Sequence, residues 1–87
     1  MDIQKAAKAG TMESSDVYVM VQPNENNGII IELESIVKKQ FGKQIKEIIQ
    51  ETLGELKVKN IHLVAKDRGA LDYTIKARVE TAIRRGM

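Results

Sequence analysis

A short polar segment, residues 10–16 (Gly-Thr-Met-Glu-Ser-Ser-Asp), holds the side chains best placed to do chemistry. It separates a Lys/Ala-rich stretch from the apolar run Val17–Val21. The adjacent hydroxyls of Ser14 and Ser15 offer a nucleophilic oxygen, and loops carried by a rigid scaffold often present functional groups in this way. Serine and aspartate are also common turn residues, so the simpler alternative is a turn without further function.

Other residue combinations that could support catalysis or metal binding are weak. The chain has no cysteine, which excludes a thiolate nucleophile, a disulfide and a cysteine-based metal site. His62 is the only histidine. Without a second histidine or a cysteine, we expect a half-exposed strand residue and no metal site. Glu13 and Asp16 could form a carboxylate pair, but solvated loop acids are the simpler interpretation. No spacing supports a Ser-His-Asp triad around Ser14.

Length and charge place limits on the class of protein. With 87 residues the chain predicts a single domain, 1–87, with a modest core. Residues 1–37 hold two lysines against six acidic residues, whereas residues 38–87 hold twelve Lys/Arg against six. The basic half could bind nucleic acid, an acidic protein surface or a phosphorylated ligand. No stretch approaches the roughly 18 consecutive apolar residues of a membrane span, so we expect no membrane association.

The first half of the chain predicts an arm and two strands. Residues 1–9 are too few to hold a helix alone and are expected to form a flexible arm, either frayed or docked on the rest of the domain. The run Val17–Val21 is β-branched or apolar at nearly every position and predicts a strand. Asn27-Gly28 is a strong hairpin signal, because both residues tolerate positive φ. We therefore expect residues 29–34 to form a second strand, antiparallel to the first.

A long amphipathic helix is predicted somewhere within Ser35–Leu56. Its start is open: Ser35 could be the N-cap, or the second strand could run on to Ile36 and the helix begin near Lys39. Lysines fill much of the opposite face, which favours a solvated helix face over a binding patch. Three- and four-residue steps predict one buried stripe made of Val37, Phe41, Ile45, Ile48, Ile49, Thr52, Leu53 and Leu56.

The last third predicts one more strand and one more helix. Val58–Ala65 alternates as a strand should. Residues 71–79 alternate too, but Leu71, Ile75 and Val79 also step as a helix would, and the basic residues near the end favour a helix. The prediction is an α+β fold, a small two-layer sandwich in which an antiparallel sheet packs on two helices in the order β-β-α-β-α.

Five segments together resemble the acyl carrier (gamma) subunit of bacterial citrate lyase. Residues 9–17 (Ala-Gly-Thr-Met-Glu-Ser-Ser-Asp-Val) are similar to the segment that carries that family's prosthetic group. The other similar segments are residues 35–42 (Ser-Ile-Val-Lys-Lys-Gln-Phe-Gly), 51–53 (Glu-Thr-Leu), 67–71 (Asp-Arg-Gly-Ala-Leu) and 76–79 (Lys-Ala-Arg-Val). Met12 replaces a leucine and Tyr73 a cysteine that are common in the family, and neither change touches a hydroxyl.

The resemblance implies a role for Ser14. In that family the first serine of the pair carries 2'-(5''-phosphoribosyl)-3'-dephospho-CoA, joined through a phosphodiester and ending in a thiol. A chain without cysteine needs a thiol from such an arm to hold a thioester. Position favours the same residue: if Asp16 belongs to the entrance of the strand, Ser15 is held by backbone or capping bonds, while Ser14 projects further into solvent.

The resemblance also implies partners and a cellular place. The chain would be a non-catalytic carrier subunit in the cytoplasm, binding neither nucleic acid nor membrane. A prosthetic-group transferase would attach the arm. The transferase (alpha) subunit would exchange acetate for citrate on the arm, and the lyase (beta) subunit would cleave the citryl thioester to oxaloacetate and restore the acetyl form.

The alternative function is a small basic α+β nucleic-acid-binding domain. The excess of Lys/Arg in the second half motivates it. Only three aromatic residues, Tyr18, Phe41 and Tyr73, are available for stacking on bases, and no Gly-x-x-Gly loop is present. The carrier interpretation is therefore the stronger hypothesis.

Overall fold

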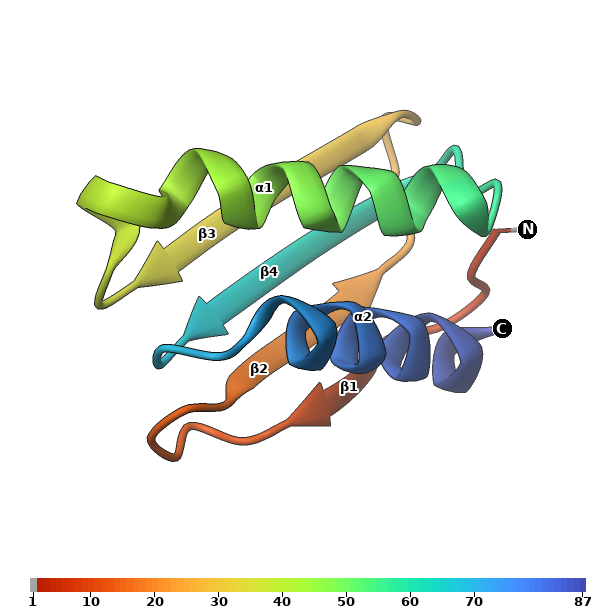
Figure 1. The fold of residues 1–87 in the computed structure, drawn as a ribbon. Helices are drawn as coiled ribbons and strands as arrows, with labels where there is room; N and C mark the ends of the chain where they lie inside the picture. Colours follow the sequence, from red (N-terminus) through yellow and green to blue (C-terminus); the bar gives the residue numbers. More distant parts are fainter. Residues whose placement is uncertain (1) are drawn as a thin grey trace.

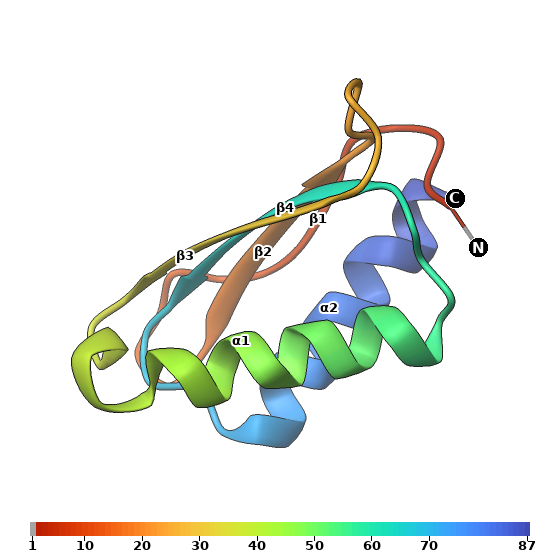
Figure 2. The ribbon, with the colours of Figure 1, turned by 90° about the horizontal axis from the view of Figure 1, so that it is seen from above.

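Two layers make up the molecule: a four-stranded sheet and a pair of helices that both cover one face of it (Figure 1, Figure 2). The computed structural model describes residues 2–87. The elements are β1 (Ala7–Gly10), β2 (Val17–Gln22), β3 (Ile29–Ser35), α1 (Lys38–Glu55), β4 (Ile61–Asp67) and α2 (Asp72–Gly86). The α+β two-layer prediction is confirmed, and the order β-β-α-β-α holds from β2 onward, with β1 as an additional first strand.

The sheet is mixed, which corrects the prediction of an antiparallel sheet. Its spatial order is β1-β2-β4-β3, in which β4 pairs antiparallel with β2 and parallel with β3. The predicted hairpin between residues 17–21 and 29–34 is therefore wrong, although Asn27 and Gly28 do adopt positive φ in a turn. The turn signal was local. Which strands pair was decided by β4, whose buried side chains place it at the centre of the sheet with partners on both edges.

Residues 2–9 are held against the domain, which corrects the prediction of a flexible arm over residues 1–9 and agrees with its docked alternative; Met1 lies outside the described residues. Ala7–Gly10 is the edge strand β1, in which Ala9 lies opposite Val19. Ile3 is buried against the core, and the N–H groups of Gln4 and Lys5 donate to the carbonyl of Gly86 over 2.7 and 3.1 Å. Burial of apolar surface and the β1–β2 ladder hold this segment in place, which its composition did not reveal.

The core lies between the helices and the covered face of the sheet. Successive side chains of a strand point to opposite faces, so every second residue of β2 and β4 enters it. Its main members are Val17, Val19 and Val21 of β2, Ile61, Leu63 and Ala65 of β4, Ile45, Ile49 and Leu53 of α1, and Ile75, Val79 and Ile83 of α2.

The helix boundaries settle two open alternatives. β3 continues to Ser35 and α1 begins at Lys38, close to the later of the two predicted starts. α2 confirms the helical interpretation of the last segment. One member of the predicted stripe is wrong: Phe41 remains 47% exposed. It borders an open groove between α1 and residues 69–73, and none of residues 2–87 covers it fully there.

Candidate functional site

The polar segment between β1 and β2 forms a tight turn. The N–H of Asp16 donates to the carbonyl of Glu13 over 3.2 Å, which places Ser14 and Ser15 at the centre of the turn. Ser15 has a φ of +64°, a left-handed conformation that non-glycine residues adopt at some cost. The surrounding structure must therefore hold the turn in this shape.

Backbone hydrogen bonds to Arg68, the residue just after β4, help to keep the turn in this shape. The N–H of Ser15 donates to the carbonyl of Arg68 over 2.8 Å, and the N–H of Arg68 donates to the carbonyl of Asp16 over 2.9 Å. Within residues 2–87 no hydrogen bond involves Ser14, and its side chain is exposed. The turn thus fixes the backbone of Ser15, while both serine hydroxyls are exposed and make no hydrogen bond within residues 2–87.

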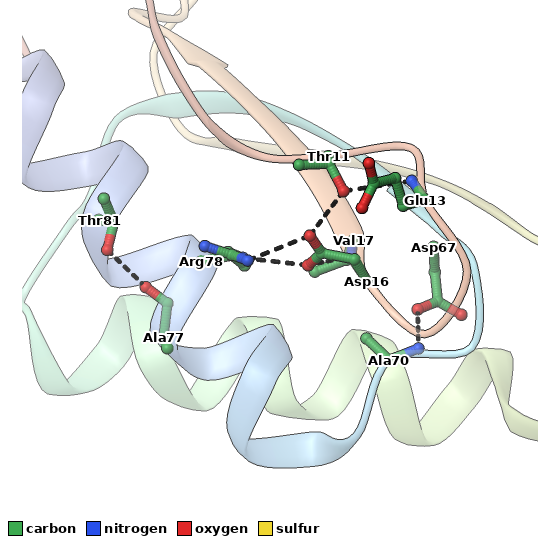
Figure 3. Close-up of polar contacts among 9 residues, drawn as sticks. All are labelled: Thr11, Glu13, Asp16, Val17, Asp67, Ala70, Ala77, Arg78 and Thr81. Atoms are coloured by element: carbon green, nitrogen blue, oxygen red, sulfur yellow. Dashed lines mark hydrogen bonds and ion pairs between the residues drawn. The ribbon is translucent and has the colours of Figure 1, made fainter.

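Asp16 is the polar centre of the loop (Figure 3). The Arg78 guanidinium of α2 donates from Nε to Oδ1 over 3.0 Å and from Nη2 to Oδ2 over 3.1 Å. The Thr11 hydroxyl donates to Oδ2 over 2.7 Å, and the Val17 N–H donates to Oδ1 over 2.8 Å. Every carboxylate oxygen therefore has at least one strong donor, and the loop is tied to both β2 and α2.

These donors set the charge state of Asp16. Burial alone would raise its pKa, but the hydrogen bonds from Arg78, Thr11 and the Val17 N–H outweigh burial and lower the pKa to about 2. The prediction of solvated loop acids is thus wrong for Asp16, whose side chain is only 14% exposed. Glu13 is exposed, as predicted.

Gly10 allows the chain to change direction at the end of β1, next to the contact between Asp16 and Arg78. Its φ is +86°, and a Cβ built on it would lie 1.8 Å from the carbonyl oxygen of Val17 and 3.3 Å from Cδ of Arg78. No side chain fits there, because contacts of that length are far inside van der Waals distance. The glycine at the head of the polar segment is therefore a structural requirement of the loop.

A second buried carboxylate, Asp67, organises the connection from β4 to α2. It is fully buried and accepts hydrogen bonds from the Ser35 hydroxyl (2.8 Å), the Gly69 N–H (3.2 Å) and the Ala70 N–H (2.9 Å). In the sheet it lies opposite Val17. Asp67 thereby fixes the turn that contains Arg68, and the carbonyl of Arg68 accepts the hydrogen bond from Ser15.

Neither Asp67 nor Arg78 was predicted to belong to the site. Both lie within segments that resemble the carrier family. An aspartate followed by Arg-Gly indicates a turn, which could have suggested a structural role for Asp67. Arg78 gave no comparable signal. Its partner Asp16 is 62 residues away, so only folding brings the pair together.

The structure keeps His62 away from the serine loop. His62 lies opposite Gln22, at the far end of β2 from Val17. Its Nε2 is 2.6 Å from Oε2 of Glu32, and its side chain is part-exposed, as predicted for this position. In the described part of the chain no cluster of histidine and acidic residues could hold a metal ion. Nor is either helix there long and apolar enough to cross a membrane.

Comparison with known proteins identifies the family. A family model described as "ACP: Malonate decarboxylase delta subunit (MdcD)" matches residues 4–86. The chain is 58% identical over 85 residues to the citrate lyase acyl carrier protein of Halothermothrix orenii, covering 98% of this chain and 89% of that protein. This chain belongs to the citrate lyase acyl carrier protein family. The corresponding protein of Streptococcus mutans serotype c is 54% identical over 85 residues, with 98% of this chain and 83% of that protein covered.

A solved structure shares the fold of this citrate lyase acyl carrier family member. It is a chain in the crystal structure of a Pseudomonas malonate decarboxylase hetero-tetramer in complex with malonate, with a TM-score of 0.80 over 95% of this chain and 84% of that chain. The sequence identity is 15%, so this likeness concerns the fold alone. Family membership gives the chain an acyl carrier role and implies a covalently attached prosthetic group.

Proposed function

We propose that this chain is the acyl carrier subunit of a cytoplasmic citrate lyase and that Ser14 carries its prosthetic group. One observation supports the choice of residue above others. Both serines are exposed and neither hydroxyl has a hydrogen bond within residues 2–87, but the N–H of Ser15 donates to the carbonyl of Arg68, whereas no hydrogen bond there holds any part of Ser14.

The residues of the loop fit a phosphodiester-linked arm. An exposed hydroxyl on a turn can enter the active site of a modifying enzyme and afterwards point a long substituent into solvent. The chain has no cysteine, so an acyl thioester must be held by a group attached to it. When bound, 2'-(5''-phosphoribosyl)-3'-dephospho-CoA would supply a terminal thiol that holds acetyl and citryl groups as thioesters.

The chain's own contribution is to present that arm. Arg78, Thr11 and the Val17 N–H hold the Asp16 carboxylate, and Asp16 in turn fixes the C-terminal side of the serine turn. The residues that flank the serine turn are thus held rigidly, while the attachment point at Ser14 remains exposed. Such tethering raises the effective concentration of an acyl group at partner active sites.

The arrangement assigns no chemical step to the carrier itself. Among residues 2–87 no general base is hydrogen-bonded to Ser14, and His62 lies at the far end of β2. We therefore place the catalytic residues on partner subunits. These are the transferase (alpha) subunit, which exchanges acetate for citrate, and the lyase (beta) subunit, which releases oxaloacetate; a prosthetic-group transferase attaches the arm.

Substitution of each serine tests the proposal. The Ser14→Ala protein should fold normally but accept no arm from the prosthetic-group transferase, and it should not support citrate cleavage. The matched Ser15→Ala protein should still be modified. Intact-mass measurement after incubation with transferase and precursor gives the answer. If the mass of the arm is added to Ser14→Ala but not to Ser15→Ala, the attachment point is Ser15. If no mass is added to the wild-type protein, the carrier assignment is contradicted.

Nucleic-acid binding, the alternative function, gains no support. Both relatives of 54–58% identity described above are citrate lyase acyl carrier proteins. Filter binding of random-sequence RNA or DNA at low salt, with protein at micromolar concentration, remains a direct check, and we expect no retention.

A further inference from the structure

Four large apolar side chains are exposed around one groove of the molecule. They are Ile36, in the connection from β3 to α1, Phe41 in the first turns of α1, Leu71 just before α2 and Tyr73 in the first turn of α2. We call these four residues the apolar patch. The groove has a volume of about 530 Å³ and is lined by Phe41, Leu71 and Tyr73. Ile36 reaches its margin, since Cδ1 lies 3.9 Å from the position of a Cβ on Gly69.

The patch lies at the same end of the molecule as the serine loop. β3 ends at Ser35 and β4 at Asp67, and these two residues are opposite each other; Val17, where β2 begins, is opposite Asp67 on the other side. The serine loop, the start of α1 and the start of α2 therefore lie at the same end of the strands (Figure 1). Arg68 joins them, because its backbone bonds Ser15 and Asp16 and Gly69 follows it.

The fold does not need this apolar surface. Phe41 lies in sequence on the buried stripe of α1, yet the core closes without it. Gln44 of α1 donates to both carboxylate oxygens of Asp72 over 3.1 and 3.0 Å, and this contact connects the two helices beside the groove. Contiguous exposed apolar side chains on a small protein mark interaction sites more often than chance placement. The groove is thus a preformed surface with no internal partner.

The charges beside the patch define the partner further. Lys38 and Lys43 line a hollow on the neighbouring face of α1, and Lys39 is exposed at the start of the same helix. Arg68 adds a fourth basic residue in the connecting turn. Two acids lie beside them: Glu47 lines the same hollow as the lysines, and Asp72, which lines the groove, accepts from Gln44. A complementary surface would have an apolar centre and a rim of carboxylates.

We propose that the apolar patch is the docking surface for a catalytic subunit of the carrier's own complex. The inference rests on the proposed function, because a subunit that receives an arm from Ser14 must bind within reach of the serine loop. The patch is joined to that loop by Arg68 and is bordered by positive charge. The occupant is therefore a protein surface with an apolar centre and an acidic rim, contacting Phe41, Leu71 and Tyr73.

Polar substitution of the patch tests the proposal. Phe41→Gln combined with Tyr73→Gln keeps two helix-compatible residues while removing the aromatic contacts. Ile29→Gln combined with Ile30→Gln is the control, since these exposed apolar residues lie at the opposite end of β3. Calorimetric titration against the purified transferase and lyase subunits of the same organism should show binding to at least one of them weakened roughly tenfold or more by the patch variant. The control should remain within about twofold of wild type.

A second pair of variants tests the charged rim. Lys38→Glu with Lys39→Glu should weaken binding to the same subunit and flatten its dependence on salt, because the rim lysines are expected to face carboxylates. Lys5→Glu with Lys59→Glu makes the same change of charge away from the patch and should leave the salt dependence as it is. Far-UV circular dichroism and melting curves confirm that all four proteins are folded.

Each remaining outcome decides between explanations. If Ser14 is modified and the wild type binds its subunits, but the patch variant binds equally well, the docking surface is elsewhere and the proposed function stands. If the wild type is neither modified nor bound, the proposed function fails and the docking inference with it. If sedimentation shows wild-type dimers that the patch substitution converts to monomers, a second copy covers the patch and the inference is wrong.

Discussion

Arg78 on α2 donates hydrogen bonds to both carboxylate oxygens of Asp16, over 3.0 and 3.1 Å. Asp16 lies 62 positions earlier in the chain. This bidentate contact spans the two layers of the molecule at the point where the serine loop enters β2 (Figure 3). Paired donors fix the orientation of a carboxylate as well as its position. The free hydroxyl of Ser14 is therefore presented from a base that the helix layer holds.

Removal of the Arg78 guanidinium should loosen the loop. We expect Arg78→Met to cost about 1–2 kcal/mol of the free energy of unfolding, because the partly buried Asp16 carboxylate loses two donors. Slower modification of Ser14 should accompany it. Lys76→Met is the matched control on the same helix, since Lys76 pairs with Glu55 of α1 while both side chains stay about half exposed (47% and 55%), and it should change stability little. Urea denaturation measures both, and equal effects would contradict a special role for the Arg78 contact.

Asp16 should make stability depend on pH in acid. Its pKa is lowered from 3.8 to about 2 in the folded chain, so the ionised form stabilises the fold. That contribution is complete above about pH 4 and is lost as the pH falls toward 2, at a cost of about 1–2 kcal/mol after allowance for solvent around Arg78. The stability advantage of wild type over Asp16→Asn should shrink across this window in urea titrations. A difference that stays constant from pH 5 to pH 2 would contradict the assigned shift.

Two glycines should respond in opposite directions to alanine. Gly10→Ala places a methyl group 1.8 Å from the carbonyl oxygen of Val17 at a φ of +86°, and we expect a loss of about 3 kcal/mol or more. Gly54 lies within α1 with no atom within 4 Å of an added Cβ, so Gly54→Ala should stabilise the protein by up to about 1 kcal/mol. Thermal melts of both variants distinguish the cases, and similar melting temperatures would refute the assigned geometry.

Two members of the predicted stripe of α1, one near each end of the helix, should differ in their contribution to stability. Leu53 is fully buried, and Leu53→Ala should cost about 3 kcal/mol through lost contacts and an internal cavity. Phe41 is half-exposed beside the groove, so Phe41→Ala should cost no more than about 1 kcal/mol. Chemical denaturation of the two variants provides the comparison. A large loss for Phe41→Ala would mean that the groove is closed in solution.

The sequence alone determined the local character of most elements. Alternation along Val58–Ala65 and the three- and four-residue steps of the two helical segments predicted their type, because side-chain periodicity follows directly from backbone geometry. The resemblance of five segments, residues 9–17 among them, to a carrier family predicted the family, which the comparisons confirmed. Serine at positions 14 and 15 also led to the prediction that this loop carries the chemistry, which stays a prediction.

Only the tertiary structure decided how distant segments meet. The turn at Asn27-Gly28 was predicted correctly, yet it could not specify that β4 would lie between β2 and β3, because strand pairing depends on burial across the whole sheet. The same holds for Arg78 and Asp16. Each is an ordinary charged residue in its own sequence neighbourhood, and the lowered pKa of Asp16 arises from donors that the fold brings within 3.1 Å. Long-range electrostatic and packing contacts have no local signature, so residue types alone could not reveal them.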